Sequence, residues 1–342
     1  MSLTHKEIMD TPAALRKTMN YIEENWEKIT GFLDGKKRFV FLGSGSSYSL
    51  ARSMAVMTYM HTGFPTTAIS AGDLLLHAPR YVNVVSDAAV ICISRSGLTS
   101  EMNMALDSIK PFNPQVASLI CANDTPLEQR STISINTPWA FDTSVCQTRT
   151  VTNFYFSAAY ILAKKLGDST LMEDLIHIVD NCGEFLLRCE KIADDIVKKN
   201  WTHAITLADA ELEGIAENGS LAFKEICQLP SNYYHILDSR HGPMVLFNKD
   251  TLLLAAIGEN KDKPVLNYLA DMRDKETIVV AVSDVGVEVS GVLSVAYGRK
   301  LSQIALGLPF IMLCQFISFK KAAFTGADPD QPSGLSSWIS LG

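Results

Sequence analysis

The chain has 342 residues, of which 47% are hydrophobic and 20% are charged. This length suits two domains of ordinary size, and the composition supports a buried core and excludes a disordered chain. Thirty basic against 37 acidic residues give a formal net charge of −7. The two signs are interspersed without a dense basic run, so we expect no nucleic-acid partner.

The cysteines and the apolar segments predict a cytoplasmic protein. None of the seven cysteines forms a CxxC pair, and several lie in apolar runs, which is typical of reduced core thiols. The longest uncharged stretch, residues 302–318, contains Gly307 and Pro309 and is short for a membrane span. We therefore predict a buried helix there and no membrane association. No group of residues has metal-ligand spacing, and we expect neither a metal nor a cofactor.

The first half of the chain alternates between strand and helix patterns. Residues 6–30 carry apolar side chains at helical spacing, interrupted near Pro12. A helix is expected after the first strand, up to residue 60, and another over residues 99–110. Strands are expected over residues 38–42, 66–70, 88–93, 115–121 and 132–135. This repetition predicts a parallel sheet covered on both faces.

The second half follows the same plan. Residues 150–200 have helical patterns, and a charged stretch over residues 188–199 could join two domains. Strands are then expected over residues 203–207, 233–237, 251–257, 277–282 and 292–296, and helices over residues 211–228, 263–274 and 302–320. Two halves of similar size and plan predict a duplicated α/β unit.

A loop rich in glycine and serine, Gly43-Ser-Gly-Ser-Ser47, lies between the first strand and its helix. Glycines let the backbone approach a ligand closely, and the N–H groups at a helix N-terminus attract an anion. In an open α/β sheet, ligands usually bind at this edge.

A second loop of the same character, residues 94–100, follows the strand over residues 88–93 and carries four hydroxyl side chains. Helix capping needs fewer. One such loop alone would be interpreted as an ordinary polar turn, whereas the pair favours a phosphate held between them. A dinucleotide site is not indicated, because Tyr48 stands where a third glycine is needed, and the simplest motifs of nucleotide triphosphatases, serine hydrolases and zinc proteases are absent.

Two residues of the second half are candidates for proton transfer. In the helix expected over residues 211–228, Glu225 falls on an apolar stripe with Leu221, Ala222, Ile226 and Leu229. Partial burial there suits an acid or base, although a surface glutamate at the edge of the stripe is the simpler interpretation. His241 precedes Gly-Pro, which places its imidazole in a loop.

With these residues in view, the chain resembles the tandem sugar isomerase (SIS) domain enzymes over nearly its whole length. It looks like the isomerase half of glucosamine-6-phosphate synthase and the related glucosamine-6-phosphate deaminases and fructosamine-6-phosphate deglycases. The matching motifs, in order, are KEIMDTP at 6–12, GSGSSY at 43–48, SRSGLT at 94–99, KEI at 224–226, RHGP at 240–243 and DPDQP at 328–332.

The resemblance implies an α/β protein of two SIS domains, each a mainly five-stranded parallel sheet flanked by helices in three layers. The expected divisions are a helical segment over residues 1–30, a first SIS domain with the phosphosugar-binding loops over 31–170, a helical linker over 171–200, and a second SIS domain with a C-terminal tail over 201–342.

The resemblance also implies roles for particular residues. Glu225 would move a proton between C1 and C2 of the sugar, and His241, delivered by the neighbouring subunit of a homodimer with shared active sites, would open the ring or act as a base. The phosphate loops and the lining of the sugar would comprise Ser44, Gly45, Ser46, Ser47, Ser94, Arg95, Ser96, Thr99, Val145 and Gln147.

Three positions depart from the family pattern. Ala222 and Ser337 stand where the synthases have lysines. The tail lysine can form an imine with a keto sugar and serine cannot, so we do not expect glucosamine synthesis. In the second half, Ala208-Asp-Ala210 replaces a glycine-rich loop, so a second sugar site is not expected.

We therefore expect a phosphosugar isomerase-like enzyme that removes the amine from an amino-linked sugar 6-phosphate, as a deglycase or a deaminase. Its ligand would be a sugar phosphate or an amino-sugar phosphate. An aldose–ketose isomerase needs the same acid and base and stays open, as does a sugar-phosphate sensor without chemistry.

Overall fold

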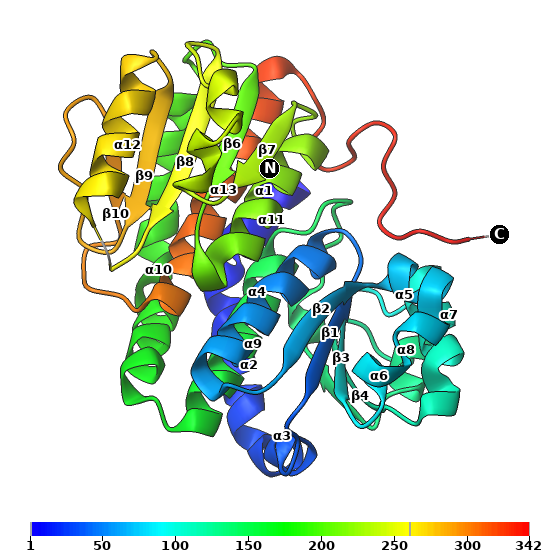
Figure 1. Cartoon of the computed structure of the whole chain (residues 1–342). Coiled ribbons are helices and arrows are strands. Elements are labelled where there is room, and N and C mark those ends of the chain that lie inside the picture. The colour runs from blue at the N-terminus through cyan, green and yellow to red at the C-terminus, as the bar shows by residue number, and fades with distance from the viewer. Residues whose placement is uncertain (1, 260, 342) are drawn as a thin grey trace. The chain divides into compact units, whose positions relative to one another are not determined.

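The computed structural model describes residues 2–259 and 261–341. Its chain divides into two units, and each contains a five-stranded parallel sheet (Figure 1). The first-sheet unit consists of Ala13–Asp168 and Ser336–Gly342, and the second-sheet unit of Met1–Pro12 and Ser169–Leu335. The predicted α/β class with two parallel sheets is confirmed.

The first sheet has the strand order β2-β1-β3-β4-β5. Its strands are β1 (Phe39–Gly43), β2 (Thr66–Ser70), β3 (Ala89–Ser94), β4 (Gln115–Ile120) and β5 (Ile133–Asn136). The helices of this part of the chain are α2 (Thr11–Glu24), α3 (Trp26–Leu33), α4 (Ser46–Thr62), α5 (Ala71–His77), α6 (Val82–Val85), α7 (Ser100–Ile109), α8 (Pro126–Gln129) and α9 (Arg149–Leu166), with the 3-10 turns η1 (Ala78–Arg80), η2 (Lys110–Phe112) and η3 (Pro138–Ala140).

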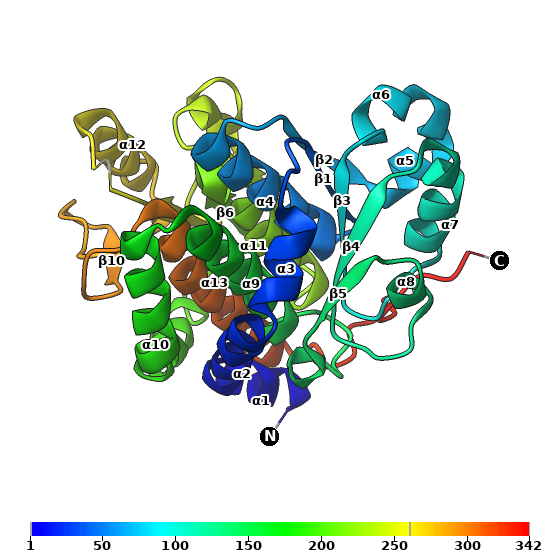
Figure 2. The same ribbon diagram turned by 90° about the horizontal axis from the view of Figure 1, so that it is seen from below.

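Helices cover both faces of the first sheet, as predicted. Helices α5 to α8 lie along one face, and α3, α4 and α9 lie along the other (Figure 2). Alternate strand residues such as Val40, Leu42 and Val90 pack with Leu74 of α5 and Ala105 of α7 in one buried cluster. The period of two along each strand sends the remaining side chains to the opposite face.

The second sheet repeats this order as β7-β6-β8-β9-β10. Its strands are β6 (His203–Leu207), β7 (Ser231–Tyr234), β8 (Thr251–Ile257), β9 (Ile278–Ser283) and β10 (Leu293–Ala296). The helices of this unit are α1 (Leu3–Met9), α10 (Ser169–Ile196), α11 (Glu213–Glu225), α12 (Lys263–Asp274) and α13 (Gln303–Thr325), with the 3-10 turns η4 (Ala210–Leu212), η5 (Asp238–Arg240) and η6 (Pro243–Leu246). Corresponding strands thus occupy corresponding positions, which agrees with the predicted duplicated plan.

Two long helices pack together in the second-sheet unit. The expected linker over residues 171–200 coincides with most of α10, which buries Leu175, Ile178 and Phe185 and packs along α13. Its apolar residues recur at helical spacing, and this gives α10 a buried face. Helix α13 is long and apolar enough to cross a membrane, but 89% of its most apolar window is buried inside the structure, so the predicted buried helix is confirmed.

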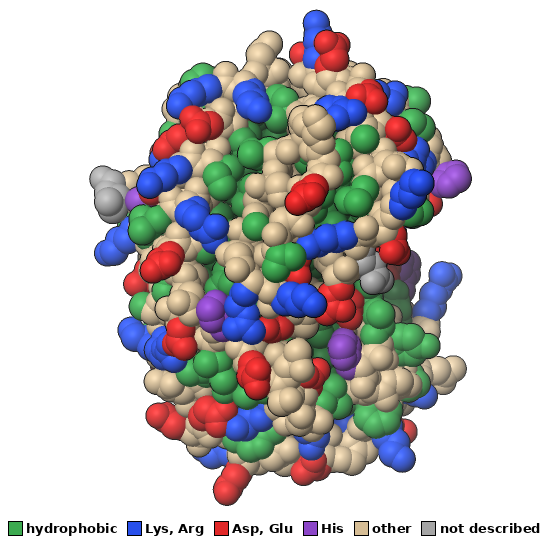
Figure 3. Space-filling model, turned by 90° about the vertical axis from the view of Figure 1, so that its left-hand side faces the viewer, with side chains coloured by type: hydrophobic (Ala, Val, Ile, Leu, Met, Phe, Trp, Pro, Cys, Tyr) green, Lys and Arg blue, Asp and Glu red, His purple; other side chains and the backbone are tan. Residues whose placement is uncertain are grey.

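Charges on the surface are mixed. On the face drawn in Figure 3, basic and acidic side chains alternate over the surface and do not gather into patches of one sign. This distribution matches the interspersed charges of the sequence.

Candidate functional site

The two serine loops lie at the carboxyl ends of β1 and β3, which are neighbouring strands. Strand β1 continues into α4 toward β2, and β3 continues into α7 toward β4, so the connections leave in opposite directions along the sheet. Because such crossovers are right-handed, α4 and α7 cover opposite faces. The gap between their starts is the position at which open α/β sheets bind ligands.

The backbone of the first loop has N–H donors that a bound anion could use. A Cβ atom on Gly43 would lie 2.4 Å from the carbonyl carbon and oxygen of Ser47, so only glycine lets α4 begin this close to β1. Gly45 adopts φ +55° as the residue before α4. Among the described residues, no backbone carbonyl accepts from the N–H groups of Gly45 and Ser46. With the positive end of the α4 dipole, these groups are suited to hold an anion.

The hydroxyls of the first loop are available to a ligand. Ser46 and Ser47 are buried, and within the described chain neither hydroxyl makes a hydrogen bond. Ser44 is half-buried, and its carbonyl accepts from the N–H of Ser47 at 3.1 Å. These three side chains add hydroxyl donors to the loop that carries the free N–H groups.

In the second loop, two of the hydroxyls shape the loop itself. Ser94 Oγ accepts from the N–H of Gly97 at 3.1 Å, and Ser96 Oγ accepts from the N–H of Leu98 at 3.2 Å. Gly97 has φ +64°, and a Cβ atom there would lie 2.5 Å from Oγ1 of Thr125. Thr99 occupies the N-cap position of α7 without a capping hydrogen bond from its side chain. The hydroxyl of Thr99 is therefore free of the capping role.

Arg95 connects the second loop to the segment that carries Val145 and Gln147. Its guanidinium is buried and donates to the carbonyl oxygens of Asp142 (3.1 Å), Ser144 (2.8 Å) and Val145 (3.0 Å). It also donates to the carbonyl of Ser337 in the tail at 2.7 Å. Arg95 thus connects three predicted parts of the site, which are the second serine loop, the segment with Val145 and Gln147, and the tail. Its guanidinium is used to hold these segments together.

The segment before α9 is held by a carboxylate that sequence reasoning missed. Asp142 is buried, and its Oδ2 accepts from the N–H groups of Thr148 (2.7 Å) and Thr150 (2.9 Å). Arg149 Nε lies 3.5 Å from Asp142 Oδ1. The aspartate stands six and eight residues before the threonines that open α9, which is beyond the spacing of the usual local side-chain turns, so the sequence carried no clear signal of this role.

Gln147 presents a buried acceptor that no protein group satisfies. Its Oε1 is buried and has no hydrogen-bond partner among the residues that the structure describes. A buried unsatisfied amide oxygen costs about 1–3 kcal/mol, and a sugar hydroxyl could satisfy it. Val145, two residues earlier, is half-buried on the same segment. The thiol of the neighbouring Cys121 is no candidate nucleophile, because burial raises its pKa to about 12.

Glu225 and His241 both lie in the second-sheet unit. Glu225 is half-buried and is the last residue of α11, and His241 is exposed between η5 and η6. The loop predicted around His241 is confirmed: its N–H donates to the carbonyl of Asp238 at 2.9 Å, and Gly242 adopts φ +112°. The side chain of His241 forms no hydrogen bond within the described residues.

The apolar stripe expected on α11 is confirmed at Ile226, which follows the helix and is fully buried, but differs at its other apolar positions. Leu221, Ala222 and Glu225 are half-buried, whereas the fully buried positions include Gly219 and Phe223. The buried face of α11 requires small residues where it meets α13, because a Cβ atom on Gly219 would lie 3.0 Å from the sulfur of Cys314 on α13. Lys224 is next to Glu225, and burial lowers the pKa of its ammonium.

The corresponding loop of the second sheet carries an acidic side chain where the first sheet has serines. After β6, the carboxylate of Asp209 accepts from the N–H of Ile236 at 2.9 Å and lies 3.3 Å from Nδ1 of His235. An acidic side chain at this place repels phosphate. Strand β7 covers Ser231–Tyr234 and ends two residues before Ile236, so the strand predicted over residues 233–237 is misplaced.

Comparison with known proteins identifies the fold of the part that holds both serine loops. Residues 32–162 match the model of the SIS domain family. This range also includes Arg95, Val145 and Gln147. The match lies within the first-sheet unit, and a SIS domain in the second-sheet unit remains a prediction.

Curated relatives are distant but extend over nearly the whole chain. A glutamine–fructose-6-phosphate aminotransferase of Aquifex aeolicus is 24% identical, with 98% of this chain and 57% of the relative covered. A D-galactosamine-6-phosphate deaminase of Escherichia coli is 22% identical, with 96% and 91% covered. The chain thus spans somewhat more than half the length of the aminotransferases it matches and most of the deaminase.

Solved structures share the fold. Glucosamine-6-phosphate deaminase of Thermotoga maritima superposes with a TM-score of 0.86 at 23% identity, covering 99% of this chain and 100% of that one. Tagatose-6-phosphate ketose/aldose isomerase of Escherichia coli gives a TM-score of 0.86 at 20% identity, covering 100% and 96%.

Proposed function

We propose that this chain, with its SIS domain over residues 32–162, is an enzyme that removes the amine from an amino-linked sugar 6-phosphate. The observation that carries the proposal is the pair of serine loops at the ends of β1 and β3, with free N–H groups at Gly45 and Ser46. Relatives that match nearly the whole chain include a D-galactosamine-6-phosphate deaminase. The second solved relative, a ketose/aldose isomerase, keeps isomerisation as the alternative.

In the proposed binding mode, the phosphate takes the position between the loops. The N–H groups of Gly45 and Ser46 and the hydroxyls of Ser47 and Thr99 would donate to its oxygens. The half-buried Val145 and the unsatisfied Oε1 of Gln147 would contact the sugar. Charge-assisted hydrogen bonds of this kind contribute about 1.5–3 kcal/mol each to the binding free energy. The phosphate would therefore be the main determinant of substrate binding.

The proposed reaction is a proton transfer followed by hydrolysis. For a 6-phosphofructosyl amino acid, His241 would remove a proton from C1 to give an enolamine, and Glu225 would protonate C2. The resulting imine at C1 would then add water and release glucose 6-phosphate and the free amino acid. Atoms and electrons balance without an outside oxidant, because C1 is oxidised as C2 is reduced.

The substrate nitrogen compensates for the missing lysine in this proposal. Ser337 stands in the tail where a lysine would form an imine with a keto sugar, whereas a glycated substrate brings its own amine. Borohydride added with fructose 6-phosphate should therefore leave the protein mass unchanged. A mass increase equal to a reduced sugar imine would show that another lysine of the chain fulfils this role.

We further propose a cytoplasmic homodimer in which His241 acts on substrate bound to the other copy. The exposed, unbonded imidazole of His241 supports this arrangement. Mixing inactive Glu225→Gln and His241→Asn proteins should then restore part of the activity through hybrid sites. If activity does not recover after subunit exchange has been verified, each chain must form its own active site.

A substrate panel separates the three candidate functions. Incubation with 6-phosphofructosyl amino acids, amino-sugar 6-phosphates and plain aldose or ketose phosphates should release amine from a nitrogen-bearing substrate. Rapid aldose–ketose interconversion without amine release would favour the isomerase. Tight binding with no turnover of any member would favour the sensor.

A further inference from the structure

A cavity of about 480 Å³ lies in the first-sheet unit, between the sheet and helices α3, α4 and α9. Strand side chains that form its floor include Phe41 of β1, Ile91 of β3 and Ala117 of β4. These three residues are neighbours in register across the strands. Ile91 is only half-buried although its strand is central, because the helices do not close over this part of the sheet.

The cavity lies at the opposite end of the strands from the serine loops. Lys36 and Lys37, just before β1, line it, as do Phe64 before β2 and Ile133 at the start of β5. The candidate phosphate site begins at Gly43, the last residue of β1. A ligand in the cavity would therefore occupy a second, separate place in the same unit.

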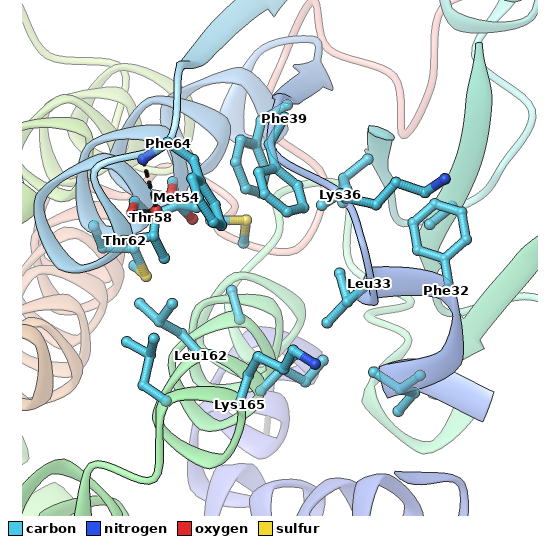
Figure 4. A pocket seen from close by; sticks show the side chains of 18 of the residues that line it. Phe32, Leu33, Lys36, Phe39, Met54, Thr58, Thr62, Phe64, Leu162 and Lys165 are labelled. Carbon is cyan, nitrogen blue, oxygen red and sulfur yellow. Dashed lines mark hydrogen bonds between the residues drawn. The ribbon is translucent and has the colours of Figure 1, made fainter. Parts of the chain in front are cut away.

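The interior of the cavity is apolar and its rim is cationic. Figure 4 shows Phe39, Met54 and Phe64 facing the space from one side and Leu162 of α9 from another. Three lysines and one aspartate line the same cavity, and they are Lys36, Lys37, Lys165 and Asp34.

Two of the rim lysines are available to an anion. Lys165 Nζ hydrogen-bonds to the carboxylate of Asp34 and to Oγ1 of Thr30 at 3.0 Å. Within the described part of the chain, Lys36 and Lys37 form no ion pair. Two positive charges at the edge of an apolar space are thus left without a counter-charge.

We propose that this cavity binds an amphipathic carboxylate, such as a medium-chain fatty acid. The apolar body would cover Phe41, Ile91 and Ala117, and the carboxylate would remain at the rim beside Lys36 and Lys37. The volume falls in the range of small-molecule pockets, about 300–1,000 Å³, which combine apolar walls with a few polar groups. A flat surface of another protein would not reach Ile91 and Ala117 in the middle of the sheet, so the depth favours a slender ligand.

Calorimetric titration with decanoate tests the proposal, in the absence of any sugar phosphate. Decanoate should bind with one site per chain, and decanol, which lacks the charge, should bind at least about tenfold more weakly. Lys36→Glu should weaken decanoate binding about tenfold or more. Lys110→Glu, an exposed charge reversal outside the cavity, should leave it unchanged.

A second variant fills the cavity from the helix side. Ala158→Phe on α9 places a ring into the space and should abolish decanoate binding while thermal unfolding shows a folded protein. Unchanged affinity in both Lys36→Glu and Ala158→Phe would overturn the proposal. So would a change in oligomeric mass in Ala158→Phe without an effect on decanoate, since that result would assign the cavity to a second copy of the chain. The outcome does not depend on the reaction proposed at the serine loops.

Discussion

The guanidinium of Arg95 donates a hydrogen bond of 2.7 Å to the carbonyl oxygen of Ser337, 242 residues further along the chain. The same guanidinium binds three carbonyls of the segment that precedes α9. Arg95 therefore holds the C-terminal tail and the segment before α9 against the second serine loop.

Replacing Arg95 should release the tail. Arg95→Ala leaves buried carbonyls without a donor, each at a cost of about 1–3 kcal/mol. We expect a lower unfolding midpoint and faster chymotrypsin cleavage at Trp338. Arg130→Ala, which removes an exposed pair with Asp107 in the same unit, is the matched control and should leave tail cleavage unchanged. Equal cleavage rates in wild type and Arg95→Ala would contradict this role.

The hydroxyl of Thr99 is the cleanest probe of phosphate binding, because it makes no capping hydrogen bond to α7. Thr99→Val should lower affinity for sugar phosphates about tenfold or more, as expected for a lost hydrogen bond to a charged acceptor. The unfolding temperature should change little. Ser108→Ala removes an exposed hydroxyl from the same helix, bonded only to the carbonyl of Met104, and should not affect binding. Full affinity in Thr99→Val would remove Thr99 from the site.

Gly43 should tolerate no side chain. Gly43→Ala places a Cβ atom 2.4 Å from the backbone of Ser47, and we expect a loss of about 1–3 kcal/mol in the free energy of unfolding. Gly31→Ala, with nothing within 4 Å of its Cβ, should instead stabilise the protein by about 0.4–1 kcal/mol. Urea unfolding of both variants measures this contrast in the free energy of unfolding. A Gly43→Ala protein as stable as Gly31→Ala would show that α4 can shift away from β1.

Asp330 should make the second-sheet unit sensitive to acid. Its carboxylate accepts from the N–H groups of Leu3 and Thr4, both at 2.8 Å. Burial raises the pKa of Asp330, but these hydrogen bonds outweigh burial and hold the pKa below its usual 3.8. Because the folded-state pKa is lowered, the stabilisation is complete above pH 3.8 and is lost as the pH falls through the lowered value.

Asp330→Ala should therefore cost about 1 kcal/mol at pH 6, the typical loss for a helix cap. The difference from wild type should shrink as the pH falls below 3.8. Urea unfolding at several pH values measures this difference, with the exposed Glu288→Gln as control. A difference that is constant down to pH 2 would show that Asp330 acts through packing alone.

Much of the fold could be predicted because long apolar patterns determine it. The strands over residues 66–70, 203–207 and 251–257 and the helix over 263–274 match β2, β6, β8 and α12 residue for residue. The short helices α5, α6 and α8 were not predicted, since helices of four to seven residues carry too few turns to show a period.

The candidate site could be predicted only in part. Serine and glycine at strand ends indicate an anion site by local chemistry alone. The bonds of Ser94 and Ser96 within their own loop are local, whereas those of Arg95 to carbonyls up to 242 residues away depend on tertiary contacts. The stripe of α11 was partly misplaced for the same reason: Gly219 faces Cys314, and a glycine carries no hydrophobic signal.

Turnover in deuterium oxide tests the central claim most directly. A 6-phosphofructosyl amino acid should yield free amino acid and glucose 6-phosphate with deuterium at C2, detected by NMR, because Glu225 delivers a solvent-exchangeable proton there. Glu225→Gln should bind the substrate with similar affinity and release no amine, the pattern of a group that acts in the transition state. Wild-type protein that binds glycated and amino-sugar 6-phosphates, but releases no amine and incorporates no deuterium, would contradict the account.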